Sequence, residues 1–242
     1  MLNLSPSSIG LFIKCPFSFN KRYIEKIPFK EKIYPSGLVG TVFHAIAETF
    51  FNEGVFTKER LMSIAEQSIK INNANTVIID KHYDRLMSML DTFYIEFNSK
   101  GLLISPYYTE HSFKKEFAFE KFPTLVLKGK IDLLLNKDQH FYLIDFKTGA
   151  LDKEGTYIQG NIYMYLLPDI VLDSCYFFFP MDGKFIKVKR CDKVFLDLLL
   201  EKIVKTIELG NFNRKKGKHC IFCGYKNLCG QVEKDDKLYL GG

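Results

Sequence analysis

The chain has 242 residues, enough for one sizeable domain or for one core with helical additions. Hydrophobic residues make up 47%, which excludes a disordered chain, and the net charge of +6 suits either a protein that meets a polyanion or an ordinary basic enzyme. No apolar run reaches the roughly 18 residues needed to span a bilayer, and the N-terminus lacks the features of a signal peptide, so we expect a cytoplasmic protein without membrane contact.

Helical patterns dominate the first hundred residues. Ser5 and Pro6 predict a helix start, because Ser caps the first amides and Pro at the first helical position loses no hydrogen bond; this helix should reach about Cys15. A second amphipathic helix is predicted after Gly37, and helical patterning continues to about Lys100. The apolar positions at helical spacing include Val39, Phe43, Ile46, Phe50, Leu86, Leu90, Phe93 and Phe97.

Strand patterns follow. Residues 113–120, 124–135 and 140–147 are rich in aromatic and β-branched residues, with a turn predicted at 136–138. A short helix is expected at 157–167, strands at 174–180 and 184–190 around a turn at 181–183, a helix at 194–209, and then a loop-like segment that contains cysteines. With no internal repeat or linker, the sequence predicts one α/β domain over 1–242: a helical N-terminal part (1–112), an α/β core (113–210) and a C-terminal Cys-rich segment (211–242).

Two carboxylates and a lysine should meet on the predicted hairpin. Asp145 and Lys147 are two apart on a strand and share a face, while Asp132 should end or follow the preceding strand. Two carboxylates make an oxygen-rich site suited to Mg²⁺ or Mn²⁺, and a lysine beside them can activate water and stabilise charge developing on a phosphate. The same D-x-K spacing is common on solvent-facing strands, so this motif alone does not decide between the two interpretations.

Four motifs occur in a fixed order: GTVFH (40–44), GKID (129–132), DFKTG (145–149) and QGNIY (159–163). Together they resemble the RecB-like branch of the PD-(D/E)xK nucleases, which read G-x-x-H, G-x-(I/V)-D, (D/E)-x-K-T-G and Q-x-x-x-Y; the first motif is one residue longer here. The resemblance spans essentially the whole chain. It implies a restriction-endonuclease-like mixed sheet flanked by helices, and a metal-dependent nuclease that hydrolyses DNA phosphodiesters.

The resemblance also assigns roles by position. Asp132 and Asp145 would bind Mn²⁺ or Mg²⁺ together with the carbonyl of Phe146, and Lys147 would be the catalytic lysine. His44 would be a further metal ligand that favours Mn²⁺. Without the motif context, a lone His on an apolar helix is usually a core residue.

Other polar residues surround this set. Gln159 and Tyr163 are four apart and therefore share a helix face, and the resemblance has them steady the site or touch DNA. Glu48 and Glu116 are further carboxylates that could reach the site, but we interpret each as structural or solvent-facing.

The cysteines predict a second site, because thiols stay reduced in the cytoplasm and six of them point to metal binding or free thiols rather than disulfides. Four thiolates could hold zinc or a 4Fe–4S cluster, and spacing alone does not decide between the two. The candidate ligands are Cys15, Cys220, Cys223 and Cys229. Cys175 and Cys191 lack partner spacing and are interpreted as ordinary buried or free cysteines.

The resemblance favours the cluster. Iron–sulfur members of this nuclease branch, including AddB-type subunits and CRISPR-associated RecB-like exonucleases, have one Cys before the nuclease core and three after it. Their first Cys lies in a C-P-x-x-(F/Y) setting, which CPFSF at 15–19 matches. A cluster here would be mainly structural, because hydrolysis needs no electron.

A basic run precedes the last cysteines and would either hold DNA phosphates or form a solvated surface. Its members are Arg214, Lys215, Lys216 and Lys218. Three nearby aromatic residues would stack on bases of a single strand or shield the cluster. They are Phe212, Phe222 and Tyr225.

The similarity to short, stand-alone members predicts an exonuclease on single-stranded DNA ends. Its partner would be the CRISPR adaptation integrase or another DNA-processing complex. The alternative is a non-catalytic DNA-binding or scaffold subunit that keeps the fold and the cluster. The complete set of Asp132, Asp145 and Lys147 argues against that alternative. The sequence predicts neither cleavage polarity nor oligomeric state.

Overall fold

The computed structural model describes residues 2–28, 35–71, 82–119, 122–167, 170–172 and 174–230. The chain forms two compact units, each assembled from segments that are not contiguous in sequence. Unit 1 comprises Met1–Lys32, Glu116–Leu127 and Asp192–Gly242, and unit 2 comprises Ile33–Lys115 and Lys128–Cys191. In the part of the chain that is described, no helix is long and apolar enough to cross a membrane.

Among the described residues, six strands form one mixed sheet in the order β1-β3-β4-β5-β6, and β2 pairs with β3. The strands are β1 (Leu2–Leu4), β2 (Pro106–Phe119), β3 (Phe122–Lys137), β4 (His140–Phe146), β5 (Ser174–Phe179) and β6 (Lys184–Lys189). β4 runs antiparallel to β3 and parallel to β5, and β5 runs antiparallel to β6. This mixed sheet with flanking helices confirms the predicted fold class.

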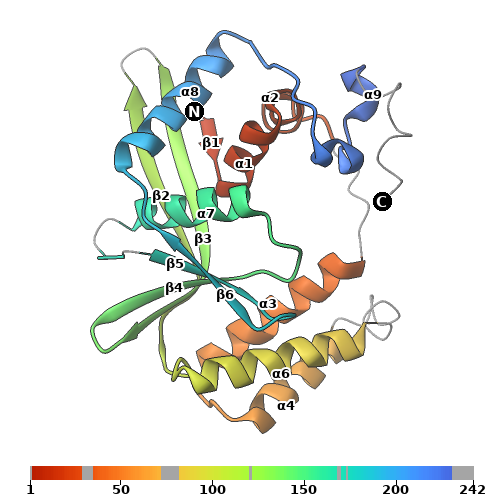
Figure 1. The fold of residues 1–242 in the computed structure, drawn as a ribbon, viewed down its shortest axis with the longest axis vertical. Helices are drawn as coiled ribbons and strands as arrows, with labels where there is room; N and C mark the ends of the chain where they lie inside the picture. The colour runs from red at the N-terminus through yellow and green to blue at the C-terminus, as the bar shows by residue number, and fades with distance from the viewer. Residues whose placement is uncertain are drawn as a thin grey trace. The chain divides into compact units, whose positions relative to one another are not determined.

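Unit 2 has a hydrophobic core on each face of its strands. On one face, helices α3 (Pro35–Glu53), α4 (Lys58–Ile71) and α6 (Tyr83–Ser99) lie together (Figure 1) and share a core with β3, β4 and β5. There the ring of Phe146 packs edge-on against Phe43 and Phe93, at centroid distances of 5.6 and 5.8 Å. Helix α7 (Lys153–Leu166) forms the second core with the other face. Because side chains alternate along a strand, burying Phe146 among the helices turns its neighbours toward α7.

Unit 1 holds both described ends of the chain. β1 pairs in parallel with residues 125–127 of β3. Helix α1 (Pro6–Lys14) starts at a capping box made by Ser5 and Ser8, which confirms the predicted start. The remaining helical elements are α2 (Pro16–Phe19), a π-helical turn (Asn20–Ile24), α8 (Lys193–Glu208), a 3-10 turn (Lys218–Phe222) and α9 (Lys226–Cys229).

Several predicted bounds were wrong. β2 begins at Pro106 rather than at 113. The prediction missed its first residues because no described residue of this strand is fully buried and its apolar pattern is weak. β1 was not predicted, because a strand of only three residues is too short to show an alternating hydrophobic pattern. α7 begins at Lys153 because the side chain of Asp152 accepts a hydrogen bond from the amide of Gly155 and caps the helix. The C-terminal segment predicted to be loop-like contains the 3-10 turn and α9.

The turn between β3 and β4 is also displaced. β3 continues to Lys137, and the turn residues are Asp138 and Gln139, with φ of 52° and 66°. The predicted turn at 181–183 is confirmed, with Gly183 at φ 64°. The helical patterning predicted across 72–81, the strand end at 120 and the segment 231–242 lie outside the described residues.

Candidate functional site

The two carboxylates and the lysine of the predicted hairpin lie close together in unit 2. The Oδ2 atom of Asp132 accepts a hydrogen bond of 2.7 Å from the amide of Phe146. The Nζ atom of Lys147 lies 2.5 Å from Oδ2 of Asp145, and the amide of Lys147 donates to the carbonyl of Phe178 at 2.8 Å. The prediction that Asp132 ends its strand is wrong, because β3 continues to Lys137 in pairing with β4. β4, with a strand on either side, therefore holds this set in place.

Asp145 is a buried carboxylate held by α7. Its Oδ1 atom accepts hydrogen bonds from Nε2 of Gln159 (2.9 Å) and from the hydroxyl of Tyr163 (3.0 Å). Burial, and then the charge of Asp132, raise the pKa of Asp145 to about 6, while Lys147 opposes the shift. Its Oδ2 atom contacts the ammonium of Lys147 but accepts no well-aligned hydrogen bond among the described residues. The ion pair with Lys147 is the interaction that balances the charge of this buried oxygen.

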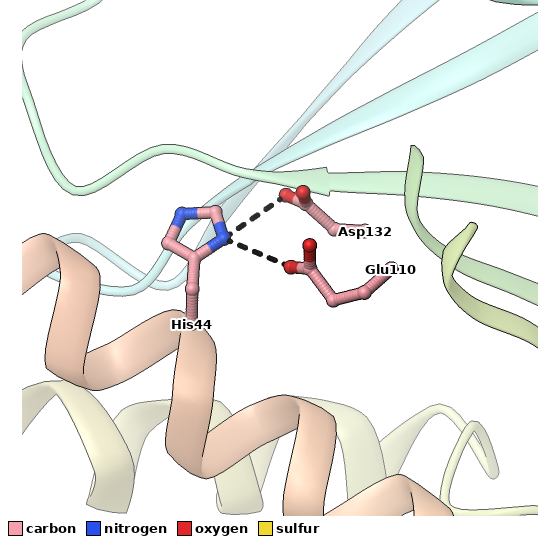
Figure 2. Close-up of side chains that lie close together, drawn as sticks. All are labelled: His44, Glu110 and Asp132. Carbon is pink, nitrogen blue, oxygen red and sulfur yellow. Dashed lines mark ion pairs between the residues drawn. The ribbon is translucent and has the colours of Figure 1, made fainter. Parts of the chain in front are cut away.

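An imidazole and two carboxylates converge beside this pair. Figure 2 shows His44 of α3 pointing toward Asp132 and Glu110; its Nδ1 atom lies 3.4 Å from Oδ2 of Asp132 and 3.7 Å from Oε1 of Glu110. One ligand atom from each of the three residues lies within 4.8 Å of the others. Burial lowers the pKa of His44, but its interactions with Asp132 and Glu110 outweigh this and raise the pKa to about 10. This donor set fits a divalent ion such as Mn²⁺ or Mg²⁺. A bound ion would replace the proton that the His44 imidazole holds next to the two carboxylates.

The converging residues open onto a cleft of about 530 Å³. His44, Asp132 and Glu110 line it, while Asp145 is almost fully buried, with its side chain 3% exposed. The other lining residues are Gly37, Gly40, Thr41, Ala45, Glu48, Lys130 and Thr148. The site is thus reachable from solvent through an open, polar cleft.

The segment that follows Lys147 is tied to two helices. The carbonyl of Thr148 accepts a hydrogen bond of 3.1 Å from Nη2 of Arg85 on α6. Gly40 of α3 approaches the side chain of the same residue so closely that a Cβ atom at position 40 would lie 2.4 Å from Oγ1 of Thr148. Two of the four sequence motifs are therefore close neighbours, and a side chain at position 40 would force the hydroxyl of Thr148 to move.

We expect Gly40→Ala to destabilise the protein by about 1–3 kcal/mol and to reduce nuclease activity, because the new methyl group overpacks the segment that carries Lys147. Chemical denaturation and initial cleavage rates measure both effects. Adding Thr148→Ala removes the oxygen at 2.4 Å and leaves the Cβ of residue 148 at an ordinary 3.5 Å, so the double variant should recover stability. Failure of this rescue would show that the contact does not explain the loss.

Sequence reasoning missed two residues of this region. Glu110 lies in β2 outside every motif, and its unusual backbone (φ 45°) has no local sequence signal. Arg85 lies in a helix with an apolar pattern, and its charge at that position was the sequence feature that could have pointed to a role near the site. Glu48, which was interpreted as structural or solvent-facing, lines the cleft, and Glu116 belongs to unit 1.

Comparison with known proteins identifies the family. A family model described as the PD-(D/E)XK nuclease superfamily matches residues 3–230. The chain belongs to this superfamily. No curated protein matches it. A solved structure named "Crystal structure of SSO0001" is similar at 13% sequence identity with a TM-score of 0.46, covering 94% of this chain and 85% of that chain. PD-(D/E)XK nucleases are phosphodiester hydrolases that use divalent metals such as Mg²⁺ or Mn²⁺.

In this PD-(D/E)XK nuclease, the predicted cysteine ligands lie around one cavity of unit 1. The cavity is lined by Cys15, Ser18, Arg214, Lys215, Lys216, His219, Cys220, Cys223, Lys226 and Cys229. Cys15 is buried between α1 and α2, and the hydroxyl of Ser18 lies 3.3 Å from the Sγ atom of Cys223. The structure thus brings the four predicted cysteines to the lining of one cavity.

The remaining cysteines lie in unit 2. Cys175 is fully buried in the α7 core, and burial raises the pKa of its thiol well above the usual range. Cys191 is half-buried, and its amide donates to Oδ1 of Asn161 at 2.6 Å. Neither residue is close to the other four cysteines in sequence or belongs to their cavity.

The basic run borders the cysteine cavity, and part of it makes internal contacts. Lys215 donates to the carbonyl of Ile13 at 3.1 Å, and the guanidinium of Arg214 lies 5.0 Å from the ring centre of Phe17. Lys216 lines the cavity, and Lys218 is exposed. Among the predicted stacking residues, Tyr225 is 2% exposed and donates its hydroxyl to the carbonyl of Ile27 at 3.0 Å, so it is not available to a base. The side chain of Phe222 lies outside the described residues, and Phe212 is half-buried.

Proposed function

We propose that this chain is a deoxyribonuclease of the RecB-like branch, a single nuclease domain that degrades single-stranded DNA from its ends. The observation that carries the proposal is the convergence of Asp132, Asp145, Lys147 and His44 in unit 2, beside an open cleft. These residues come from three of the four motifs on which the resemblance rests. A surface Asp–Lys pair, the alternative interpretation, would leave Asp145 exposed, yet its side chain is only 3% exposed.

The residues that would hold Mn²⁺ or Mg²⁺ are His44, Asp132 and Asp145, with the carbonyl of Phe146. A bound divalent ion would supply Lewis acidity and lower the pKa of a coordinated water. The ring of Phe146 is anchored among the helices and its amide is bonded to Asp132, so its backbone is held rigidly between the two acidic residues. His44 adds a nitrogen donor and favours Mn²⁺ over Mg²⁺.

The remaining site residues would orient the attacking water and the Asp145 carboxylate, and would balance negative charge. Lys147 carries a positive charge next to Asp145 and would orient the attacking water and stabilise charge on the phosphate. Gln159 and Tyr163 both donate to Oδ1 of Asp145, which leaves its Oδ2 atom directed to cations. Their role in this proposal is positioning rather than contact with DNA.

We further propose that Cys15, Cys220, Cys223 and Cys229 hold a 4Fe–4S cluster with a structural role. The four cysteines line one cavity of unit 1, which supports a shared metal centre, and four thiolates could hold either zinc or a cluster there. The motif resemblance favours the cluster.

The biological partners follow from the resemblance. DNA is the expected substrate, and phosphate contacts by exposed basic residues such as Arg214, Lys216 and Lys218 would give affinity that weakens with salt. The similarity to CRISPR-associated exonucleases supports the adaptation integrase, or another DNA-processing complex, as a protein partner.

The proposal is tested by degradation of end-labelled linear and circular single-stranded DNA with Mn²⁺, Mg²⁺ or EDTA. Lys147→Ala is run beside the wild type and beside Lys153→Ala, which removes an exposed lysine at the start of α7. We expect loss of the linear substrate with either metal, no loss in EDTA, and at least about a thousandfold slower cleavage by Lys147→Ala alone.

Attack on circles would assign endonuclease activity in addition to end-dependent degradation. A wild type that binds DNA but cleaves nothing with either metal would contradict the proposal and favour the non-catalytic scaffold subunit. Equal activity of wild type and Lys147→Ala would show that the reaction does not take place at this site.

A further inference from the structure

Glu110 is held in an unusual backbone conformation at the edge of the cleft. Its φ of 45° is in the left-handed region, which costs free energy for a residue other than glycine and persists where the surroundings require it. The preceding residue, Thr109, is anchored to α3 by a hydrogen bond of 2.5 Å from its hydroxyl to Oδ1 of Asn52. His44 projects from the same helix, so this conformation fixes the carboxylate of Glu110 beside that imidazole.

The second oxygen of Glu110 is engaged by a lysine from the neighbouring strand. Oε2 forms an ion pair with Nζ of Lys130 in β3, while Oε1 is the atom that faces His44. The Glu110 side chain is 13% exposed, whereas that of Lys130 is 57% exposed. The carboxylate is therefore the fixed member of the pair, and the flexible, solvated ammonium is the member that can leave.

We propose that Glu110 is an additional ligand of the divalent ion and that Lys130 is its exchangeable counterion. One ligand atom of Glu110 already lies within 4.8 Å of those of His44 and Asp132. An ion among these three residues would bring two positive charges close to Lys130, and repulsion would displace the ammonium toward the cleft. The inference rests on the metal site of the proposed function and adds to it a residue outside all four motifs.

Ion and ammonium thus compete for one carboxylate, and this competition predicts effects of opposite sign. Removing the charge of Glu110 weakens ion binding because a ligand is lost. Removing the charge of Lys130 strengthens ion binding because the competitor is lost. A role of the pair in stability alone would not produce opposite changes in ion affinity.

Titration calorimetry with Mn²⁺ alone, without DNA, tests the proposal on the full chain. We expect Glu110→Gln to raise the Kd about tenfold or more, and Lys130→Gln to lower it about threefold. In the double variant, Lys130→Gln should give no tightening, because its effect acts only through Glu110. Lys128→Gln is the matched control, since it removes an exposed lysine from the same strand, two residues away.

An unchanged Kd in Glu110→Gln overturns the proposal, as does equal tightening by Lys128→Gln and Lys130→Gln, which would indicate only general charge. Thermal melts of each variant identify any that fail to fold, and Glu110→Asp, which keeps the charge, then replaces Glu110→Gln with an intermediate Kd expected. Asp132→Asn distinguishes the proposed metal site from the added role of Glu110 in that site. If Asp132→Asn abolishes Mn²⁺ binding while Glu110→Gln leaves the Kd unchanged, the proposed metal site stands and the role of Glu110 falls.

Discussion

Asp145→Asn is expected to slow DNA cleavage by about a thousandfold or more, because the site loses about 4 kcal/mol of transition-state stabilisation when a charged ligand becomes a neutral amide. The substitution preserves shape. Oδ1 of the asparagine can still accept from Gln159 and Tyr163, but its amide would point donors at the ammonium of Lys147. Single-turnover cleavage with saturating Mn²⁺ measures the loss.

The same substitution should change how stability depends on pH in the metal-free protein. The pKa of Asp145 is about 6 in the folded state, above its ordinary value of 3.8, so the folded protein binds this proton more tightly than the unfolded chain. The contribution of Asp145 to stability is therefore lost as pH rises from about 4 to about 6. The amide introduced by Asp145→Asn does not titrate, so the unfolding free energy of the variant minus that of the wild type should increase across this window. A difference that does not vary with pH would contradict the assigned pKa.

Asp138→Asn is the control for both measurements. Asp138 lies exposed in the turn between β3 and β4, where its φ of 52° suits asparagine equally well. This variant should cleave DNA at the wild-type rate. A comparable loss in Asp138→Asn would mean that Asp145→Asn acts through a general effect on the hairpin.

Cys15→Ser is expected to abolish the brown colour of anaerobically purified protein and to lower its melting temperature strongly. A metal centre that forms only in the folded state contributes its binding free energy to folding, and losing one of four ligands removes much of that contribution. Cys15 is buried between α1 and α2, and so its loss would remove the N-terminal ligand of the proposed cluster from unit 1. Iron and acid-labile sulfide content, together with calorimetric melting, measure the effect.

Cys191→Ser is the matched substitution, because Cys191 is half-buried in unit 2 and does not line the cysteine cavity. Its iron content and colour should equal those of the wild type. Unchanged iron in Cys15→Ser would rule out Cys15 as a ligand. Stoichiometric zinc with no iron in the wild type would show that the four cysteines bind zinc rather than a 4Fe–4S cluster.

Local spacing predicted the centre of the candidate site well. Asp145 and Lys147 share a face because they are two apart on a strand, and Gln159 and Tyr163 share one because they are four apart on a helix; each pair meets as expected. Glu110 and Arg85 were not predictable, because their positions depend on a distorted strand and on a helix that contacts a distant loop. The start of β2 was missed for a related reason, since the strand residues whose burial is described are not fully buried and leave little hydrophobic alternation to detect.

The non-contiguous make-up of unit 1 has a consequence for the order of folding during synthesis. Unit 2 has all its segments once residue 191 has left the ribosome, whereas unit 1 needs Asp192–Gly242 to join Met1–Lys32. Ser18 and Cys223, which touch in the folded chain, are 205 residues apart in sequence, and closing so long a loop is slow. As a ligand of the proposed cluster, Cys15 would be translated long before the other three cysteines and would have to stay reduced until they emerge. Assembly of the proposed cluster therefore has to wait until the segment that carries Cys220, Cys223 and Cys229 has been translated.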